Sequence, residues 1–580
     1  MADPTNSEIA TALDELGDLY ELDGAVIHRI VAYRNAAKAI RDATVSVSAL
    51  ARQDRATELA GVGATIQEKV LALADTGAIP ALEKLRARFP PGLIAMTRLP
   101  GLGPKRARRL YEELGIDSLP ALRQAATEQR IRTLKGFGPK AEEALLAAAS
   151  AAGAGEARTR VVLHRALAAA EPLVAELRAH PAADRVELAG SARRMADSVK
   201  DLDVIVTAHD PLGLAQAAAA SALVEAAGTP TEAGVRLTTH TGIKVDLKIV
   251  APDQFGNLLQ HFTGSKEHNM ALRDAAVRRG LHVSEYGLTD DATAETHRCA
   301  TEAQVYALLG LQYIEPELRE NRGELEAAAA GALPTLITVE DLKGDLHCHT
   351  TASDGTASIA EMARAALEAG YEYLAITDHS ASFGFGEDMS PERLKAHVEA
   401  IRSAEVPGIT LLAGSEVNIL PDGSLDYDDA TLAELDWAIA SVHSSFGMAA
   451  DAMTARIIRA IEHPYIDAIG HLSGRKIERR APYRFDPEAV IAAAARTGTM
   501  LEINASPDRR DLDETNARAA AAAGVPIIIN CDAHRTGGFA AARYGVATAR
   551  RGWLGPAQVV NTLPWPEFAP LRKRAAAAPR

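Results

Sequence analysis

The feature that most constrains the fold of this chain is a series of short apolar segments between residues 340 and 575, each followed by a helical pattern. The segments read GDLHCHT, EYLAITDHS, ITLLAGSEVNI, WAIASVHS, AIGHLSG, TMLEINAS and VPIIINCDAH. A repeated strand-then-helix order predicts a barrel-like α/β domain. Nearly every segment ends in a polar side chain, and α/β barrels carry their active sites at the carboxyl ends of the strands. We therefore expect a functional site there.

The polar residues at these strand ends are of the types that bind transition metals. The candidate metal ligands are His347, His349, Asp354, His379, Glu416, His443, His471, Asp532 and His534. Imidazole combined with carboxylate suits Zn²⁺, Mn²⁺ or Fe²⁺, and nine such ligands can hold up to three ions. A single histidine at a strand end is most often a polar surface residue, but recurrence on successive strands favours a metal cluster. Such a cluster activates water and binds the phosphate of a phosphoester.

The pattern HCHT…SDG…TDH…CDAH resembles the polymerase-and-histidinol-phosphatase (PHP) domain and matches all nine ligand positions of that family. The resemblance implies a distorted (β/α)7-type barrel over residues 344–575 that binds up to three ions, Mn²⁺ and/or Zn²⁺. His463 and Arg475 are secondary candidates for contacting substrate phosphate. His28 and His397 are expected to be ordinary surface histidines.

A second candidate site, made of carboxylates, lies in GSARRMADSVKDLDVIV (190–206). Asp201 and Asp203 are one residue apart on a predicted strand, so their side chains share one face. Like charges this close are unfavourable unless a cation joins them, and hard oxygen ligands suit Mg²⁺ or Mn²⁺. The strand predicted from KVDLKIV can place Asp246 beside them. This set favours nucleotidyl transfer by a two-metal mechanism.

The turn before the first of these strands carries groups that suit a triphosphate. Gly190 and Ser191 offer a backbone N–H and a hydroxyl, while Arg193 and Arg194 add positive charge. An isolated Asp-x-Asp is weak support for an active site and is usually an exposed strand end. The combination with this turn and a later strand aspartate is much stronger.

Residues 1 to about 320 resemble the family X DNA polymerases, the group that contains polymerase beta. The stretch HFTGSKEHNMALR (261–273) is similar to the Tyr-Phe-Thr-Gly-Ser stretch of that family. The resemblance implies a nucleotide-binding set of Gly190, Ser191, Arg194, Phe262, Gly264, Asn269 and Arg273. Phe262 and Gly264 would border the sugar, and Asn269 and Arg273 would lie near the nascent base pair. His261 stands where tyrosine is usual, so the sequence leaves sugar discrimination open.

A turn pattern recurs three times in the first 150 residues, which otherwise show helical periodicity. Each copy is an apolar residue, then Gly-apolar-Gly, then a helix. Such turns bring backbone N–H groups close to a DNA phosphate without reading the base sequence, whereas a plain packing glycine is the alternative. The candidate DNA-binding residues are Gly61, Gly63, Gly101, Gly103, Lys105, Gly136 and Gly138.

Members of this family can carry a deoxyribose-phosphate lyase in the amino-terminal domain, with a lysine as nucleophile. Lys69 stands at the matching position, and Tyr33 also fits. Thr65 and Arg29 occupy positions where lyase members usually have lysines. An ordinary exposed helix lysine is therefore the favoured interpretation of Lys69.

We expect a multidomain chain with an all-α helix-hairpin-helix region, an α/β nucleotidyltransferase palm with a thumb, and the carboxyl-terminal barrel. The expected domains are an 8-kDa-like helical domain at 1–85, a helical fingers domain at 86–155, the palm at 156–260, the thumb at 261–325, a linker at 326–343 and the PHP domain at 344–575. A softer linker is expected around residues 147–157.

Composition adds limits on partners and compartment. The net charge of −15 argues superficially against nucleic acid, but metal-binding carboxylates contribute to it and GPKRARRL is locally basic. No apolar run approaches the roughly 20 residues of a membrane span, and the amino terminus lacks a signal-peptide layout. Three cysteines in 580 residues favour a reducing cytoplasm over a disulfide framework.

The whole chain resembles a bacterial family X DNA polymerase with a carboxyl-terminal PHP domain. The resemblance implies gap-filling synthesis in repair, on gapped or primer–template DNA with deoxynucleoside triphosphates. It also implies a metal-dependent 3′→5′ exonuclease that processes 3′ ends, with abasic-site cleavage as a further activity.

Two alternatives stand beside this interpretation. A histidinol-phosphatase-like enzyme of small molecules, fused to a DNA-binding scaffold, would have no use for the Gly-x-Gly turns or for Asp201, Asp203 and Asp246. A non-catalytic DNA-end-binding scaffold would retain buried carboxylates at a cost in stability.

Overall fold

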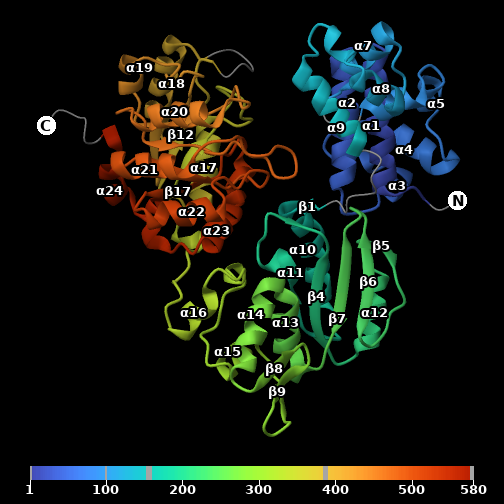
Figure 1. Cartoon of the computed structure of the whole chain (residues 1–580), viewed down its shortest axis with the longest axis vertical. Helices are drawn as coiled ribbons and strands as arrows, with labels where there is room; N and C mark the ends of the chain where they lie inside the picture. The colour runs from blue at the N-terminus through green and yellow to red at the C-terminus, as the bar shows by residue number, and fades with distance from the viewer. Residues whose placement is uncertain (1–2, 98, 100, 152–159, 383–388, 575–580) are drawn as a thin grey trace. The chain divides into compact units, whose positions relative to one another are not determined.

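The computed structural model describes residues 3–97, 99, 101–151, 160–382 and 389–574 (Figure 1). The chain forms two compact units. One comprises residues 1–161, 165–188 and 200–252, and the other comprises residues 162–164, 189–199 and 253–580. The linker expected around residues 147–157 lies partly outside the described residues. No helix in the described part of the chain is long and apolar enough to span a membrane.

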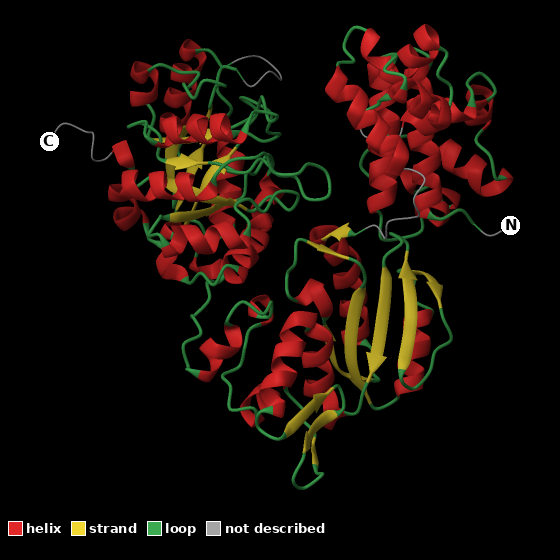
Figure 2. Cartoon of the chain, in the orientation of Figure 1, coloured by secondary structure: helices red, strands yellow, loops and turns green. Residues whose placement is uncertain are grey.

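The amino-terminal region of the first unit is helical (Figure 2). Its helices are α1 (Asn6–Leu22), α2 (Ile27–Asp42), α3 (Val47–Arg52), α4 (Ala64–Thr76), α5 (Pro80–Arg86), α6 (Pro91–Thr97), α7 (Pro104–Leu114), α8 (Leu119–Thr127) and α9 (Pro139–Ala151). Their apolar faces share one core, which includes Leu13, Leu16, Ile40 and Leu110. Helix α1 is central because it packs against α2, α5, α6 and α7.

A five-stranded sheet forms the second part of the first unit. In spatial order its strands are β2 (Ala183–Leu188), β4 (Leu202–Ala208), β7 (Lys244–Ile249), β6 (Gly234–Thr239) and β5 (Val224–Ala227). Strands β4 and β7 are parallel, and their register places Asp203 beside Asp246. Helix α12 (Pro211–Ala219) packs against β4, β5 and β6, and α10 (Leu163–Ala179) precedes the sheet in the chain.

The second unit begins, in chain order, with short segments and a small helical part. These are β1 (Val161–Val162), whose second residue lies in this unit, α11 (Gly190–Arg193), β3 (Ser198–Val199), α13 (Phe255–Thr263), α14 (Lys266–Val277), β8 (Leu281–Ser284), β9 (Gly287–Asp290), β10 (Thr296–His297), α15 (Glu302–Leu308) and α16 (Glu324–Ala329). A core that includes Leu272, Leu288, Val305 and Leu318 holds this part together. The buried guanidinium of Arg319 donates to a carboxylate oxygen of Glu302 at 2.5 Å, which compensates its burial.

Seven parallel strands form the rest of the second unit and follow one another in sequence order around the sheet. They are β11 (Gly344–Cys348), β12 (Tyr373–Ile376), β13 (Thr410–Asn418), β14 (Trp437–Ser441), β15 (Ala468–Ile469), β16 (Met500–Asn504) and β17 (Ile527–Asn530). A parallel bridge between Cys348 and Ala533 brings the first and last strands together, so the sheet is a nearly closed barrel. This confirms the predicted barrel.

Helices cover the outside of this barrel (Figures 1 and 2). They are α17 (Ile359–Glu368), α18 (Pro391–Ser403), α19 (Asp429–Ala433), α20 (Ala450–Ile461), α21 (Pro487–Thr497), α22 (Glu514–Ala522), α23 (Ala542–Arg551) and α24 (Trp565–Phe568). All seven strands contribute to one apolar cluster that includes Leu346, Trp437 and Ile528, so this cluster lies inside the barrel. The apolar filling leaves the polar strand ends as the place for chemistry.

Candidate functional site

The nine candidate ligands gather at the carboxyl ends of the barrel strands. Three overlapping groups place their ligand atoms within 4.8 Å of one another. The groups are His349, Asp354, His379 and His534; His347, His349 and Glu416; and His379, Glu416 and His443. His349, His379 and Glu416 each belong to two of the groups, so the three groups form one continuous cluster.

Glu416 lies at the centre of the cluster. Its carboxylate oxygens lie 2.9 Å from His379 Nδ1, 3.1 Å from His443 Nε2 and 2.9 Å from His471 Nε2. Burial alone would raise the pKa of this carboxyl, but the imidazoles around it outweigh burial and hold the pKa well below its usual range. Glu416 is therefore an anion that needs cations around it.

Asp532 lies near two of the histidines that also lie near Glu416. Its Oδ1 lies 3.2 Å from His349 Nε2 and 3.6 Å from His347 Nε2. With His471 and Asp532 in contact with the three groups, all nine predicted ligands belong to one cluster.

Several ring nitrogens in the cluster are buried without a hydrogen bond to any described residue. They include Nε2 of His347 and Nδ1 of His349. Leaving buried polar atoms unsatisfied costs free energy, and carboxylates 3.5–3.7 Å away from these two nitrogens leave room for a cation between them. The residues present therefore fit a group of divalent metal ions.

A second layer of polar side chains orients the ligands. Glu502 accepts a hydrogen bond of 2.8 Å from Nδ1 of His347, which turns Nε2 towards the cluster. Asn418 Oδ1 lies 2.5 Å from Nδ1 of His443 and has the same effect there. Sequence reasoning missed these residues, although a glutamate inside the apolar strand LEIN was a visible signal.

Two other histidines were predicted wrongly. His397 is 9% exposed rather than a surface residue, and its Nε2 lies 2.8 Å from Asp378 Oδ2, whose other partners include Thr350. His463 precedes β15 and so lies at the amino end of that strand, away from the ligands, where it contacts Asp429. It is therefore no candidate for contacting substrate phosphate. His28 is exposed, as expected.

Arg475 is engaged elsewhere. It donates 2.9 Å to the carbonyl oxygen of Arg509 and forms an ion pair of 2.8 Å with Asp197. The guanidinium thus links the loop after β15 to the loop after β16 and to Asp197, and does not serve as a substrate contact.

The three carboxylates of the second candidate site lie in the first unit. Asp203 and Asp246 are register partners on β4 and β7, and Asp201 immediately precedes β4. Burial raises the pKa of Asp203 to about 6, and the negative charges of Asp201 and Asp246 add to this effect. A divalent cation would relieve this repulsion, so the donor set fits a hard metal ion.

The residues expected to contact the nucleotide lie in the second unit. Gly190 begins α11, and Ser191 follows it. Arg194 pairs with Glu320 at 3.1 Å and donates 2.5 Å to the carbonyl oxygen of Thr263. Arg193 forms an ion pair of 2.7 Å with Glu302, so its charge is neutralised within the fold instead of adding to a triphosphate site.

The HFTGS stretch closes α13 and begins α14. Phe262 is half-buried near the end of α13, and Gly264 ends it with a φ of 70°, which favours glycine. Asn269 donates 2.7 Å to the carbonyl oxygen of His261. Arg273 is exposed, with Nη2 3.4 Å from His261 Nδ1.

The three Gly-x-Gly turns share one geometry. The first glycine has a positive φ of 93°, 79° and 90° at Gly61, Gly101 and Gly136, and the apolar residue that follows is buried. The second glycine directly precedes or caps a helix. Apart from its chain neighbours, no described residue has a heavy atom within 4 Å of a Cβ built at Gly63, Gly103 or Gly138. Such open turns expose backbone N–H groups at a helix start, with Lys105 exposed beside the second.

Lys69 lies on α4 and is half-buried. Its Nζ donates 3.3 Å to the carbonyl oxygen of Thr65 and lies 5.7 Å from the ring centroid of Tyr33. Tyr33 itself is buried and stacks on Tyr20. A lyase role for Lys69 stays a prediction.

The comparisons with known families cover most of the chain. A helix-hairpin-helix domain matches residues 4–79, a SAM-like helix-hairpin-helix tandem matches 93–151, the DNA polymerase beta thumb matches 258–320 and the PHP domain matches 345–504. The chain is 37% identical over 558 residues to the DNA polymerase/3′-5′ exonuclease PolX of Bacillus subtilis (strain 168), covering 96% of this chain and 97% of that protein. The chain belongs to the family X DNA polymerases that carry a PHP domain. The predicted family and fold class are confirmed.

The PHP part of this family X polymerase has shorter relatives as well. The chain is 36% identical over 202 residues to a probable phosphatase of Thermoanaerobacter sp. (strain X514), covering 33% of this chain and 78% of the relative. It is 29% identical over 229 residues to a probable phosphatase of Syntrophotalea carbinolica, covering 37% of this chain and 90% of the relative.

Proposed function

We propose that this family X polymerase fills gaps in DNA during repair and trims DNA 3′ ends with its PHP barrel. The observation that carries the proposal is the presence of two different ligand sets in one chain. One set has three carboxylates on and beside neighbouring strands, and the other has six histidines with three carboxylates. Hard and borderline donor sets of this kind serve different reactions.

In the polymerase centre, Asp201, Asp203 and Asp246 hold Mg²⁺ or Mn²⁺. Ions held there would lower the pKa of the primer 3′-hydroxyl and would support the pyrophosphate leaving group. The chain itself supplies the triphosphate contacts through Gly190, Ser191 and Arg194.

The pairing of Arg194 with Glu320 fixes the direction of its guanidinium. Phe262 and Gly264 border the sugar, while Asn269 and Arg273 lie near the nascent base pair. Residues 156–260 act as the palm in this proposal, and residues 261–325 act as the thumb.

In the PHP centre, the nine ligands hold up to three ions, Mn²⁺ and/or Zn²⁺. Ions held there would activate a water and would stabilise charge on the scissile phosphate. Glu502 and Asn418 keep the imidazoles of His347 and His443 in the required orientation. Hydrolysis then releases the terminal nucleotide of a DNA 3′ end.

The helix-hairpin-helix turns provide the DNA contacts. Backbone N–H groups at Gly61–Gly63, Gly101–Gly103 and Gly136–Gly138 bind phosphates of gapped or primer–template DNA, and Lys105 adds charge. Deoxynucleoside triphosphates are the second substrate. A small-molecule phosphatase fused to a scaffold is not favoured, because the match over nearly the full length is to a DNA polymerase/3′-5′ exonuclease.

A labelled primer on a one-nucleotide gap tests the proposal in Mn²⁺, with and without deoxynucleotides. The double variant Asp201→Ala/Asp203→Ala should lose extension and still shorten the primer, while His347→Ala/His349→Ala should do the reverse. Absence of both reactions in the wild-type enzyme, across several divalent metals, would refute the proposal.

A further inference from the structure

A cavity of about 200 Å³ lies where the loops after β14 and β15 meet. These two loops also carry His443 and His471, so the cavity belongs to the same end of the barrel as the metal ligands. Its lining includes Phe446, Gly474 and Tyr483. Gly474 donates from its backbone N–H to the carbonyl oxygen of His471 at 2.9 Å, which ties the lining directly to a ligand residue.

Planar groups dominate this cavity. The rings of Phe446 and Tyr483 lie nearly parallel, with centroids 6.1 Å apart and 13° between the planes. The guanidinium of Arg480 lies 4.2 Å from the Phe446 centroid, and its Nε donates 2.8 Å to the carbonyl oxygen of Gly474. Aromatic rings and arginine planes arranged in this way are the groups on which unpaired nucleobases stack.

Positive charge joins the cavity to the metal cluster. Arg509, in the loop after β16, has Nε 3.6 Å from Oδ2 of Asp532. Lys476 lies in the loop that lines the cavity and is partly buried. Burial lowers the pKa of this ammonium, and the positive charges of Arg509 and Arg480 lower it further, while the carboxylates of Asp508 and Asp532 oppose the shift. Three cations and two carboxylates therefore share this region. Such a region favours a phosphodiester anion.

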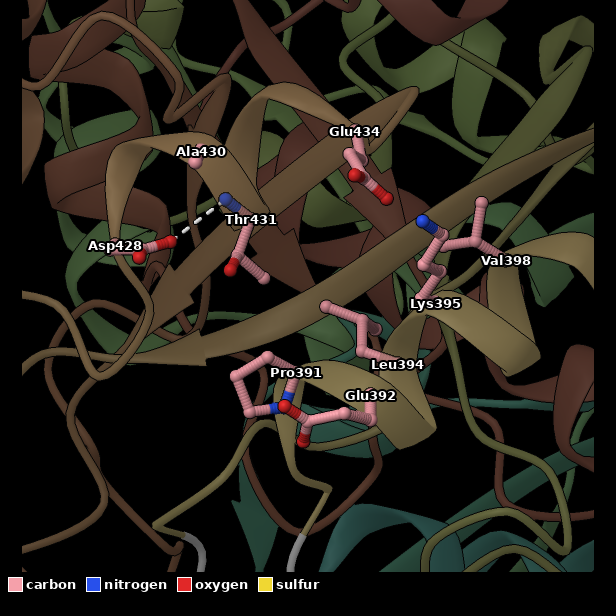
Figure 3. Close-up of a pocket in the computed structure, with 9 residues that line it drawn as sticks. All are labelled: Pro391, Glu392, Leu394, Lys395, Val398, Asp428, Ala430, Thr431 and Glu434. Carbon is pink, nitrogen blue, oxygen red and sulfur yellow. Dashed lines mark hydrogen bonds between the residues drawn. The ribbon is translucent and has the colours of Figure 1, made fainter.

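A second cavity, of about 230 Å³, lies between α18 and α19 and serves as a contrast (Figure 3). Its charged lining includes Lys395, Glu392 and Glu434, and it contains no metal ligand and no aromatic ring. Charges of both signs without a planar group do not suit a nucleotide. Lys395 therefore offers a control for Lys476.

We propose that the cavity lined by Phe446, Arg480 and Tyr483 binds a nucleobase next to the scissile phosphate of a single-stranded DNA 3′ end, while Lys476 and Arg509 hold the adjoining phosphate. The inference rests on the proposed exonuclease function and gives it a substrate class. Because every base has a flat face, stacking selects an unpaired end without selecting a sequence.

The test combines substitutions of Phe446 with removal of bases from the substrate. Two single-stranded oligonucleotides differ only in whether the last two 3′ nucleotides carry bases or are abasic. Wild-type enzyme in Mn²⁺ should shorten the base-bearing end with a kcat/KM about ten-fold higher, the effect of roughly one stacked base. Phe446→Leu should bring this ratio close to one, and Phe446→Tyr should retain it.

The outcomes distinguish failure of the proposed exonuclease function from failure of the proposed base-binding cavity. If the wild-type enzyme shortens neither oligonucleotide, the proposed exonuclease function fails. If it shortens both and Phe446→Leu keeps the wild-type ratio, the base-binding cavity is wrong while the exonuclease stands. Thermal unfolding of both variants checks that the barrel is folded.

The proposed contact between Lys476 and the phosphate is tested separately, by the KM for the oligonucleotide and its dependence on salt. Lys476→Ala should raise KM for the base-bearing oligonucleotide several-fold and reduce the slope of log KM against log salt concentration by about one. Lys395→Ala removes an exposed lysine from the other cavity and should change neither. Equal effects of the two substitutions would overturn the assignment of Lys476.

Discussion

Glu502 determines which ring nitrogen of His347 faces the metal cluster. Besides His347 Nδ1, its carboxylate accepts from the backbone N–H of His471 at 2.8 Å and from Asn530 at 2.9 Å. Glu502→Gln should therefore reduce metal occupancy and 3′-end shortening by about ten- to a hundred-fold, because ligand orientation is lost. Metal analysis after gel filtration, beside the shortening rate, checks this. Primer extension should be unchanged, and full metal content with a normal rate would contradict the role of Glu502.

Asp203 makes the stability of the fold depend on pH with a sign opposite to that of most carboxylates. Its pKa is raised to about 6 from 3.8, so the folded chain binds this proton more tightly than the unfolded chain does. The stability from this proton is present below about pH 4 and is lost as pH rises to about 6. Without divalent metal, Asp203→Asn should therefore stabilise the sheet at pH 8 by about 1–3 kcal/mol, and not at pH 4.

The three tryptophans, Trp437, Trp553 and Trp565, all lie in the second unit, so tryptophan fluorescence does not report on this sheet. Hydrogen exchange of the β4 and β7 amides measures the effect locally instead. Adding Mg²⁺ should protect the wild-type strands and leave the variant unchanged. Equal protection of both proteins at pH 8 in chelator would show that Asp203 carries no such penalty.

At the scale of helices and strands, the features that local sequence patterns control were predicted correctly. Apolar runs ending in ligand residues gave the barrel strands, and Gly-x-Gly gave turns whose first glycine needs a positive φ. Partners distant in sequence could not be predicted. Arg193 pairs with Glu302, 109 residues away, and His397 on α18 pairs with Asp378 in the loop after β12. Such pairs depend on which elements meet in space, and periodicity carries no information about that.

The turn before α7 offers a prediction at this scale. Lys105→Ala should weaken binding of gapped duplex DNA about three- to ten-fold and lower the salt slope by about one, because one phosphate contact is lost. Lys84→Ala, an exposed lysine on α5 away from the turns, is the matched control. Fluorescence anisotropy at three salt concentrations measures both. Identical slopes for the two variants would argue against DNA binding at this turn.

At the scale of the second unit, the segment that carries Ser191 and Arg194 is fastened to the PHP barrel. Asp197 pairs with Arg475 at 2.8 Å and with Arg510 at 3.3 Å, and Ser198 donates 3.0 Å to Glu478. From α23, Arg551 donates 2.9 Å to the carbonyl oxygen of Arg194. The segment that carries the proposed triphosphate contacts therefore depends on the barrel for its position.

Asp197→Ala tests this dependence. Arg510 is buried, and burial lowers its pKa to about 10 against the opposing charge of Asp197, so removing that carboxylate leaves a poorly compensated cation. We expect the free energy of unfolding of the barrel to fall by about 2–4 kcal/mol, measured by tryptophan fluorescence during urea unfolding. We also expect a higher KM for deoxynucleotides. Asp508→Ala breaks two long pairs of 3.8 Å, with His164 and Arg479, and should cost under about 1 kcal/mol. A normal KM in Asp197→Ala, with the barrel destabilised, would show that the fastening supports the fold and not nucleotide binding.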